Sequence, residues 1–513
     1  MDWRPWSART LAEAGRSGRL LFLVVAPAWS QPAARFDRQV LADRAVRQVL
    51  AESFLAVRVD PDERPDLDAR YNLGGWPSVA VLAPGGDLLA AAGIADPARL
   101  ADHLRGLAGE WQRRRPLLEG QIRRYRLPER LPELLVEPGP GWVEELEELL
   151  LRQYDPRHAG FGGAPKFLPL EPLEALAPFA PDELPAALRP LLPATLAALL
   201  RGPLRDPRGG FRRLAAEADW SDPVPERLLG ENARLLALLA RLLRSVRWRP
   251  ALEAAGLSTP ELRQAAEGIV SLLRLLARPR GGWASAAAPS RAGGGAVRAL
   301  GPVATGSSSR AAHALLLAAE AGVADADGAL RFLEGLFARL PAGPAAARAL
   351  PHGPGRNVPL RGYLGDLVPL GRACLAAWEV TDEALWLRRS LELAEGLLAT
   401  FADESGALVD LPREQAEAAG LRPAGYPALN AEAALWLLLL VRADRAPTGQ
   451  GRPSPAAGAA TGPGPARLLE AARDLLAWGL PFAPTSGWTG AHWYHPLRLY
   501  LALMAEGASS REP

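Results

Sequence analysis

Hydrophobic and polar positions change their pattern once along the chain. Over roughly the first 120 residues, short apolar runs alternate with amphipathic stretches, which predicts strands and helices in turn. An acidic segment that contains two prolines, 60–68, is expected to be a solvated loop. The strands are expected at 20–25, 54–59, 78–82 and 87–91, and the helices at 7–14, 36–53 and 97–125. This βαβ unit, followed by a hairpin and a closing helix, predicts a small α/β layer domain.

From about residue 141 onward the pattern predicts helices only, separated by loops rich in Gly and Pro. The helices are expected near 142–153, 171–178, 184–201, 229–246, 259–277, 309–322, 327–339, 364–379, 383–401, 429–442, 466–478 and 496–506. Repeated helical hairpins must stack to bury their apolar faces. About six hairpins can close into an (α/α)6 toroid with a central cavity, and an open α-solenoid is the alternative.

Four of the predicted loops resemble one another: 155–162, 206–211, 278–283 and 403–408. Each follows a long helix and ends in or near a large apolar residue, so these residues are expected to line the mouth of the toroid. Their spacing is less regular than that of a solenoid, which favours the toroid. The predicted organisation is an α/β domain over 1–125, a linker over 126–140 and the toroid over 141–508. Two segments with linker composition, 286–306 and 445–465, are predicted to be mobile loops.

Composition excludes several classes of function. The 513 residues are 49% hydrophobic and 23% charged, which is a globular balance, and the net charge of +2 indicates no nucleic-acid partner. The apolar run at 20–28 is too short to span a bilayer, so we expect a cytoplasmic protein without a membrane partner. Cys374 is the single Cys, which excludes an intramolecular disulfide and a thiolate zinc cluster. Lys166 is the single Lys among 59 cationic residues, a bias typical of a GC-rich bacterial genome.

Two motifs carry a resemblance to a known family. The first is Val57-Arg58-Val59-Asp60-Pro61-Asp62-Glu63-Arg64-Pro65-Asp66, followed by Gly74-Gly75-Trp76-Pro77, and the second is Gly160-Phe161-Gly162-Gly163-Ala164-Pro165-Lys166-Phe167. With weaker matches around Asn232 and Asn430, they make the chain similar to the spermatogenesis-associated thioredoxin-like proteins. The resemblance implies a thioredoxin-like domain followed by a six-hairpin (α/α)6 toroid.

The chain departs from this family at the redox site. Family members usually carry Cys-x-x-Cys after the first strand, and the corresponding box here is Ser30-Gln31-Pro32-Ala33. Thiol–disulfide exchange needs an attacking thiolate and a resolving thiol, so without the two sulfurs at Ser30 and Ala33 this activity is excluded. The resemblance also implies a cis peptide bond at Pro77, whereas base rates alone favour trans.

The toroid departs from the family at polar positions. The family's Trp-x-x-Pro-His-Phe-Glu segment becomes Trp220-Ser221-Asp222-Pro223-Val224-Pro225-Glu226, which keeps Glu226 and loses the His. Paired Asp positions of the family fall on Ala288 and Ser290. Glu226 is the candidate catalytic acid or base, with a place in the first turn of a helix as the simpler interpretation.

The remaining candidates for a ligand site each have a structural alternative. Lys166 could point into the toroid cavity or hold the Gly-rich loop through an ion pair. Asn232 and Asn430 could bind a ligand or belong to a buried hydrogen-bond network. The aromatic candidates Phe161, Trp220, Trp283 and Tyr363 could stack on a sugar or pack at the rim. His492 and His495 lack further ligands, so no metal or other cofactor is expected.

These observations favour a redox-inactive, catalytically degenerate member of the family. It would bind a small polar ligand, such as a carbohydrate, or a protein partner. The alternative is a carbohydrate-active enzyme of epimerase or glycoside-processing type that uses Glu226 and a second cavity carboxylate or His. An enzyme of this kind needs two titratable groups around one ligand, in environments that separate their pKa values.

Overall fold

The computed structural model describes residues 1–72, 74–125, 135–289, 296–353, 360–445 and 462–509. The described chain divides into two compact units. The first comprises Met1–Leu131, His352–Tyr363 and Asp410–Ala424, and the second comprises Pro132–Pro351, Leu364–Val409 and Gly425–Pro513. No helix among the described residues is both long enough and apolar enough to cross a membrane.

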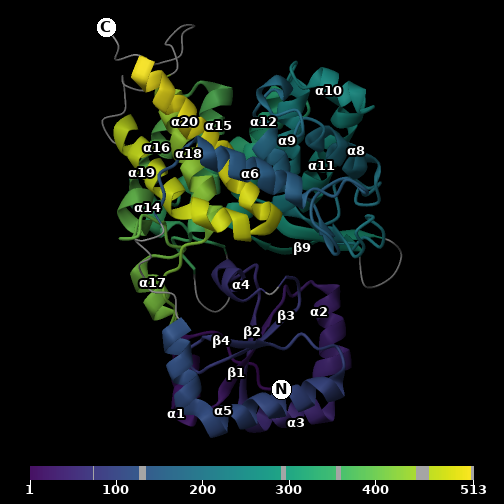
Figure 1. Ribbon diagram of the computed structural model, residues 1–513, viewed down its shortest axis with the longest axis vertical. Coiled ribbons are helices and arrows are strands. Elements are labelled where there is room, and N and C mark those ends of the chain that lie inside the picture. The colour runs from purple at the N-terminus through teal and green to yellow at the C-terminus, as the bar shows by residue number, and fades with distance from the viewer. Residues whose placement is uncertain (73, 126–134, 290–295, 354–359, 446–461, 510–513) are drawn as a thin grey trace. The chain divides into compact units, whose positions relative to one another are not determined.

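The first unit is built on a four-stranded sheet (Figure 1). The strands are β1 (Leu20–Val25), β2 (Phe54–Val59), β3 (Ser78–Leu82) and β4 (Leu88–Ala91), in the spatial order β2-β1-β3-β4. Strand β1 pairs parallel to β2 and antiparallel to β3, and β3 pairs antiparallel to β4. All six residues of β1 are buried, as the continuous apolar run predicts.

The helices of the first unit are α1 (Ala8–Ser17), α2 (Gln31–Phe36), α3 (Arg44–Ser53), α4 (Pro65–Tyr71), α5 (Pro97–Tyr125) and α17 (Arg413–Ala418). The single helix predicted over 36–53 is wrong. A π-helical turn, Asp37–Leu41, ends the first segment. Asp43 then caps α3, because its carboxylate accepts hydrogen bonds from the amides of Ala45 and Val46 at 2.8 and 3.1 Å.

The acidic segment also contains a helix that the composition did not indicate. Helix α4 begins at Pro65, where the missing N–H is not needed, and Asp66 and Asp68 in its first turn suit the helix dipole. Pro65, one of the two prolines that suggested a loop, therefore marks a helix start.

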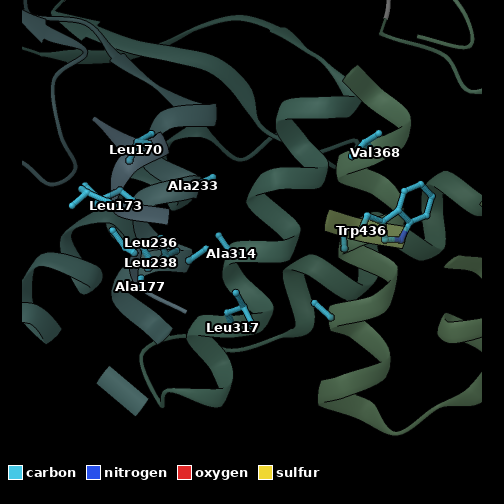
Figure 2. Packing of buried hydrophobic residues seen from close by; sticks show 14 of the residues in the cluster. Leu170, Leu173, Ala177, Ala233, Leu236, Leu238, Ala314, Leu317, Val368 and Trp436 are labelled. Carbon is cyan, nitrogen blue, oxygen red and sulfur yellow. The ribbon is translucent and has the colours of Figure 1, made fainter. Parts of the chain in front are cut away.

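Two rings of helices make up most of the second unit. The inner helices are α7 (Leu170–Leu176), α9 (Leu229–Arg244), α12 (Thr305–Glu320), α15 (Leu364–Thr381), α18 (Pro427–Arg445) and α20 (Tyr494–Ser509). Each contacts the next in this order, and α20 contacts α7, so the ring closes. Side chains from several inner helices meet in the core between them (Figure 2). The fold is therefore a thioredoxin-like domain plus an (α/α)6 toroid, as the sequence predicts.

The outer helices are α6 (Pro140–Gln153), α8 (Leu191–Arg201), α11 (Thr259–Leu276), α13 (Asp327–Phe337), α16 (Ala384–Phe401) and α19 (Pro465–Gly479). They pack on α20, α7, α9, α12, α15 and α18 respectively. Shorter elements connect them: α10 (Arg249–Ala254), α14 (Ala345–Ala349), and the 3-10 segments Pro181–Glu183, Leu480–Thr485 and Gly487–Trp493.

The second unit also contains five short strands among its described residues: β5 (Lys166–Phe167), β6 (Leu214–Ala215), β7 (Arg227–Leu228), β8 (Ala284–Pro289) and β9 (Val297–Val303). Strands β8 and β9 occupy much of the segment 286–306 that composition assigned to a loop. The Ala-rich strand β8 is mostly buried, since its small side chains allow close packing and the backbone supplies the pairing. Residues 290–295, and 446–461 of the other expected loop, lie outside the described residues.

The four similar loops fold alike. In each loop, the backbone amide of the first residue donates a hydrogen bond to the carbonyl of the residue just before the large apolar one. The four donor and acceptor pairs, 2.9–3.0 Å apart, are Asp155 and Gly160, Asp206 and Gly210, Arg278 and Gly282, and Asp403 and Ala407. An isolated β-bridge also closes each loop. In the first loop it joins Tyr154 to Phe161, and in the last it joins Ala402 to Leu408. The repeat read from the sequence is therefore a structural repeat.

Candidate functional site

The first unit replaces the redox box with a helix cap. Ser30 precedes α2, and its hydroxyl accepts a hydrogen bond from the amide of Ala33 at 3.3 Å. Ala33 is buried. The peptide bond between Trp76 and Pro77 is cis, the geometry that the resemblance implies at Pro77.

Tryptophans surround the position of the missing sulfurs. The indole of Trp29, next to Ser30, donates to Asp62 at 2.6 Å, and that of Trp76 donates to Asp68 at 2.8 Å. The two indoles meet edge to face with their centres 5.8 Å apart. Aromatic packing and Trp–carboxylate hydrogen bonds thus occupy the region after β1.

Tyr363 lies in this first unit rather than in the toroid. Its ring packs edge to face against His352 at 6.1 Å, and an imidazole nitrogen of His352 lies 3.0 Å from the carbonyl oxygen of Asp62. The interpretation of Tyr363 as a residue of the toroid ligand site is therefore wrong. The chain returns to the first unit after α14, which the helical pattern does not reveal.

Lys166 holds the first Gly-rich loop together. Its fully buried ammonium forms an ion pair with Asp155 and lies 4.9 Å from the ring centre of Trp220. Burial raises the pKa of Asp155, but hydrogen bonds from Lys166, His158 and Arg157 outweigh it and hold that pKa at about 2. The indole of Trp220 donates to the carbonyl of His158 at 2.9 Å. This is the structural alternative, an ion pair that fixes the loop.

The aromatic candidates of the toroid are packed against neighbours. Phe161 meets Tyr154 edge to face at 5.4 Å, and Trp283 meets Phe332 at 5.6 Å. Phe161, Trp220 and Trp283 expose only 1%, 5% and 5% of their surface. Rings this deeply buried offer no face to a sugar, so the structure supports rim packing for them.

Asn232 and Asn430 are buried, and each fixes one of the repeated loops by hydrogen bonds to its backbone. Asn232 accepts from the amide of Phe211 at 2.7 Å and donates to the carbonyls of Phe211 and Leu228 at 2.9 and 2.8 Å. Asn430 makes the equivalent bonds in another loop. It accepts from the amide of Leu408 at 2.7 Å and donates to the carbonyls of Leu408 and Tyr426 at 2.9 and 3.0 Å. The side-chain amide groups of both residues are hydrogen-bonded to backbone groups, so neither is available to a ligand.

Glu226 is buried, and one of its carboxylate oxygens has no hydrogen-bond partner. It precedes β7 rather than lying in an inner helix. The pocket inside the ring is lined by other residues, which come from α7, α9, α12 and α15. Sequence reasoning therefore found a buried carboxyl but not the polar centre of the toroid.

That centre is a network of ion pairs between the inner helices. On α9, Arg234 binds Glu171 and Glu174 of α7 at 2.7 and 2.6 Å. Across the ring, Arg310 of α12 binds Glu432 of α18 at 2.7 Å. Burial raises the pKa of Glu432, but Arg310 and Arg234 outweigh it and hold that pKa at about 2. Burial also raises the pKa of Glu174, but the charge of Arg234 outweighs it and holds that pKa below its usual value. The carboxylates of Glu174 and Glu432 therefore stay charged.

Glu231 and His492 of this centre have buried polar atoms without a partner among the described residues. One oxygen of Glu231 and both ring nitrogens of His492 make no hydrogen bond there, although His492 lies 3.5 Å from Glu171. Burial raises the pKa of Glu231 to about 7, against the opposing effect of Arg213 and Arg234. Burial lowers the pKa of His492, so its ring is neutral at pH 7. The charge of Glu171 raises the pKa of both groups.

A spacing in the sequence could have revealed this centre. The fourth residues of α9, α12 and α18 are Asn232, Ser308 and Asn430, which all bind loop backbone. The sixth residues, Arg234, Arg310 and Glu432, lie about 200° further around each helix and form the ion pairs. Charged residues two positions after the loop-binding residue, in otherwise apolar helices, were the sequence pattern that could have indicated this centre.

Comparisons with known proteins agree with this architecture. Residues 1–123 match a family model described as Thioredox_DsbH, a protein of unknown function (DUF255). Over 267 residues, 46% of this chain, an uncharacterised protein of Caenorhabditis elegans is 27% identical. Spermatogenesis-associated protein 20 of Homo sapiens is 26% identical over a segment of the same length. The resemblance is confirmed. The chain spans about a third of the length of these curated relatives, 35% and 33%.

Solved structures resemble the two parts separately. Cellobiose 2-epimerase from Spirochaeta thermophila aligns with 73% of this chain and 99% of its own, with a TM-score of 0.48 and 18% identity. A structure titled DsbH oxidoreductase aligns with 21% of this chain and 85% of its own, with a TM-score of 0.20 and 17% identity. Within the described residues, no group of three or more His, Cys, Asp or Glu side chains could hold a metal ion.

Proposed function

We propose that the toroid binds a small polar ligand, such as a carbohydrate, inside its inner ring. The supporting observation is the pair Glu231 and His492, whose buried polar atoms lack partners within a densely paired network. An unmade buried hydrogen bond costs about 1–3 kcal/mol, which a ligand hydroxyl would offset. Hydroxyls suit this site, because they both donate to and accept from a neutral imidazole and a carboxyl group.

The proposal gives the thioredoxin-like domain no thiol chemistry. Cys374, the one cysteine of the chain, is buried in α15, and burial raises the pKa of its thiol. A protonated, inaccessible thiol cannot attack a disulfide. Insulin reduction by dithiothreitol should therefore proceed at its uncatalysed rate when the protein is added.

A thermal-shift screen with neutral and charged sugars tests ligand binding. We expect at least one sugar to raise the Tm of the wild type, and Glu231→Gln to reduce that shift. Glu253→Gln is the matched control, because Glu253 is an exposed carboxylate on α10. If no sugar raises the Tm, or if both variants behave alike, the ring is not the binding site.

The second candidate is acid–base catalysis on a carbohydrate. Glu231, with a pKa of about 7, and the neutral His492 can give and take a proton near neutral pH, while Glu432 stays ionised. An epimerase-type reaction would exchange a sugar C–H for deuterium in D2O, which proton NMR detects. The exchange should slow about 100-fold in Glu231→Gln. Absence of both exchange and glycoside hydrolysis would contradict this candidate.

A further inference from the structure

A pocket inside the ring carries an excess of positive charge. Side chains from α7, α9, α12 and α15 line it, and its charged and polar members are Glu174, Arg234, Arg241, Arg310, His313 and Arg372. Four guanidinium groups therefore face one carboxylate. Such an imbalance in a buried space is costly unless each cation has a partner.

Two of the four arginines have partners in the chain. Arg234 is paired with Glu171 and Glu174, and Arg310 with Glu432. The first pairs join the neighbouring helices α9 and α7, and the last spans the ring from α12 to α18.

The remaining basic side chains of the pocket are two arginines and a histidine. In the part of the chain that the structure describes, no hydrogen bond or ion pair joins Arg241, His313 or Arg372 to another residue, and Nε of Arg372 is buried without a partner. Burial and then the charge of Arg241 lower the pKa of Arg372 to about 10. Burial likewise lowers the pKa of Arg241 and His313. Three inner helices thus present basic side chains without an ion pair of their own to the same pocket.

We propose that Arg241, Arg372 and His313 bind an oxyanion, a phosphate or carboxylate group carried by the small polar ligand. This inference rests on the proposed function, since the rest of the ligand would contact Glu231 and His492 in the same ring. Guanidinium groups match both oxyanions, because their planar N–H fork makes two parallel hydrogen bonds. The neutral ring of His313 adds one N–H donor. An arrangement that destabilises the empty ring is thereby stabilised when the ligand is bound.

Titration calorimetry and thermal shift on the full chain test this assignment. The probes are glucose, glucose 6-phosphate, glucuronate and inorganic phosphate, which separate the sugar from its charge and phosphate from carboxylate. We expect at least one charged sugar to bind about tenfold or more tightly than glucose, as charge-assisted hydrogen bonds imply. The better of the two charged sugars identifies the anion.

Arg372→Gln separates a binding role from a structural one. The variant should lose the preference for charged sugars, and without ligand its Tm should rise, because an uncompensated cation has been removed. Arg241→Gln should act in the same way and serves if Arg372→Gln does not fold. Arg274→Gln is the matched control, because Arg274 is exposed on α11, and it should change neither property.

The outcomes distinguish this inference from the proposed function. If glucose binds and neither charged sugar binds more tightly, the oxyanion site is wrong and the polar-ligand site stands. If inorganic phosphate binds through Arg372 and no sugar binds, the oxyanion site stands and the carbohydrate proposal fails. A lower Tm of ligand-free Arg372→Gln and Arg241→Gln, with the charge preference unchanged, would overturn the inference.

Discussion

Glu231 carries a charge that changes with pH near neutrality. Its pKa of about 7 in the folded state exceeds the usual 4.5, so folding favours its protonated form. Below pH 4.5 Glu231 is protonated in both the folded and the unfolded state, so it does not lower the free energy of unfolding. As the pH rises from 4.5 through 7, the unfolded state loses this proton more readily, and the free energy of unfolding falls. Glu231→Gln should therefore be more stable than the wild type by about 1–3 kcal/mol at pH 8 and equal to it near pH 4.5. Urea unfolding at the two pH values measures the difference, and a difference that does not change with pH would contradict a buried carboxyl at this position.

Lys166 should matter to stability rather than to ligand binding. Removing its ammonium leaves the carboxylate of Asp155 in the loop without its partner, so Lys166→Met should cost about 2–4 kcal/mol in urea unfolding. Arg157→Met, at an exposed position of the same loop, is the control and should cost little. A Lys166→Met protein of normal stability with impaired ligand binding would restore the cavity interpretation.

Individual residues were the hardest features to predict from the sequence. The candidates Asn232, Phe161 and Trp220 stood out by residue type and motif, and the structure uses all three to fix loops. Residues of the ring such as Glu231 and Arg234 are ordinary helix formers, so their type attracts no notice. Only the closure of the ring shows that charged residues of different helices, such as Arg234 and Glu174, come together.

At the scale of elements, the repeated loops depend on one buried polar side chain each. Asn232→Ala would leave the buried amide and carbonyl of Phe211 without partners and should cost about 2–4 kcal/mol. Asn430→Ala should cost a similar amount at Leu408. Because the two asparagines fix different loops, the double variant should be additive within about 0.5 kcal/mol in urea unfolding. A large deviation from additivity would mean that the loops are coupled.

The sequence pattern predicts most elements correctly and fails where backbone or side-chain hydrogen bonds decide. Strands β1, β2 and β3 match their predicted bounds because they are continuous apolar runs. The break before α3 depends on the carboxylate of Asp43, and the pairing of β8 with β9 depends on backbone groups. Neither feature alters hydrophobic periodicity, which explains why periodicity missed them.

At the scale of the molecule, the first unit is completed by segments from the far end of the chain. Arg70 of α4 binds Asp410 at 2.9 Å, and the indole of Trp6 donates to the carbonyl of Ala419 at 3.1 Å. The two partners are 340 and 413 residues away in sequence, so no local pattern could indicate these contacts. The order of the domains, by contrast, is readable from the motifs.

Asp410→Ala should therefore weaken the first unit. It would leave the guanidinium of Arg70 without its buried carboxylate, at a cost of about 2–4 kcal/mol. Amide hydrogen exchange should accelerate in β1 and β2 and stay unchanged in α9 and α12. Equal acceleration in both units would show that they unfold as one. Asp325→Ala, at an exposed position of the toroid, is the control.

The proposed ligand site is the inner ring of the toroid. A crystal structure of the protein soaked with the sugar that gives the largest thermal shift tests this proposal. We expect density for one sugar inside the ring, with hydrogen bonds to Glu231 and His492. Density only on the outer surface, or an unchanged ring whose Glu231 and His492 stay without partners at saturating sugar, would contradict it.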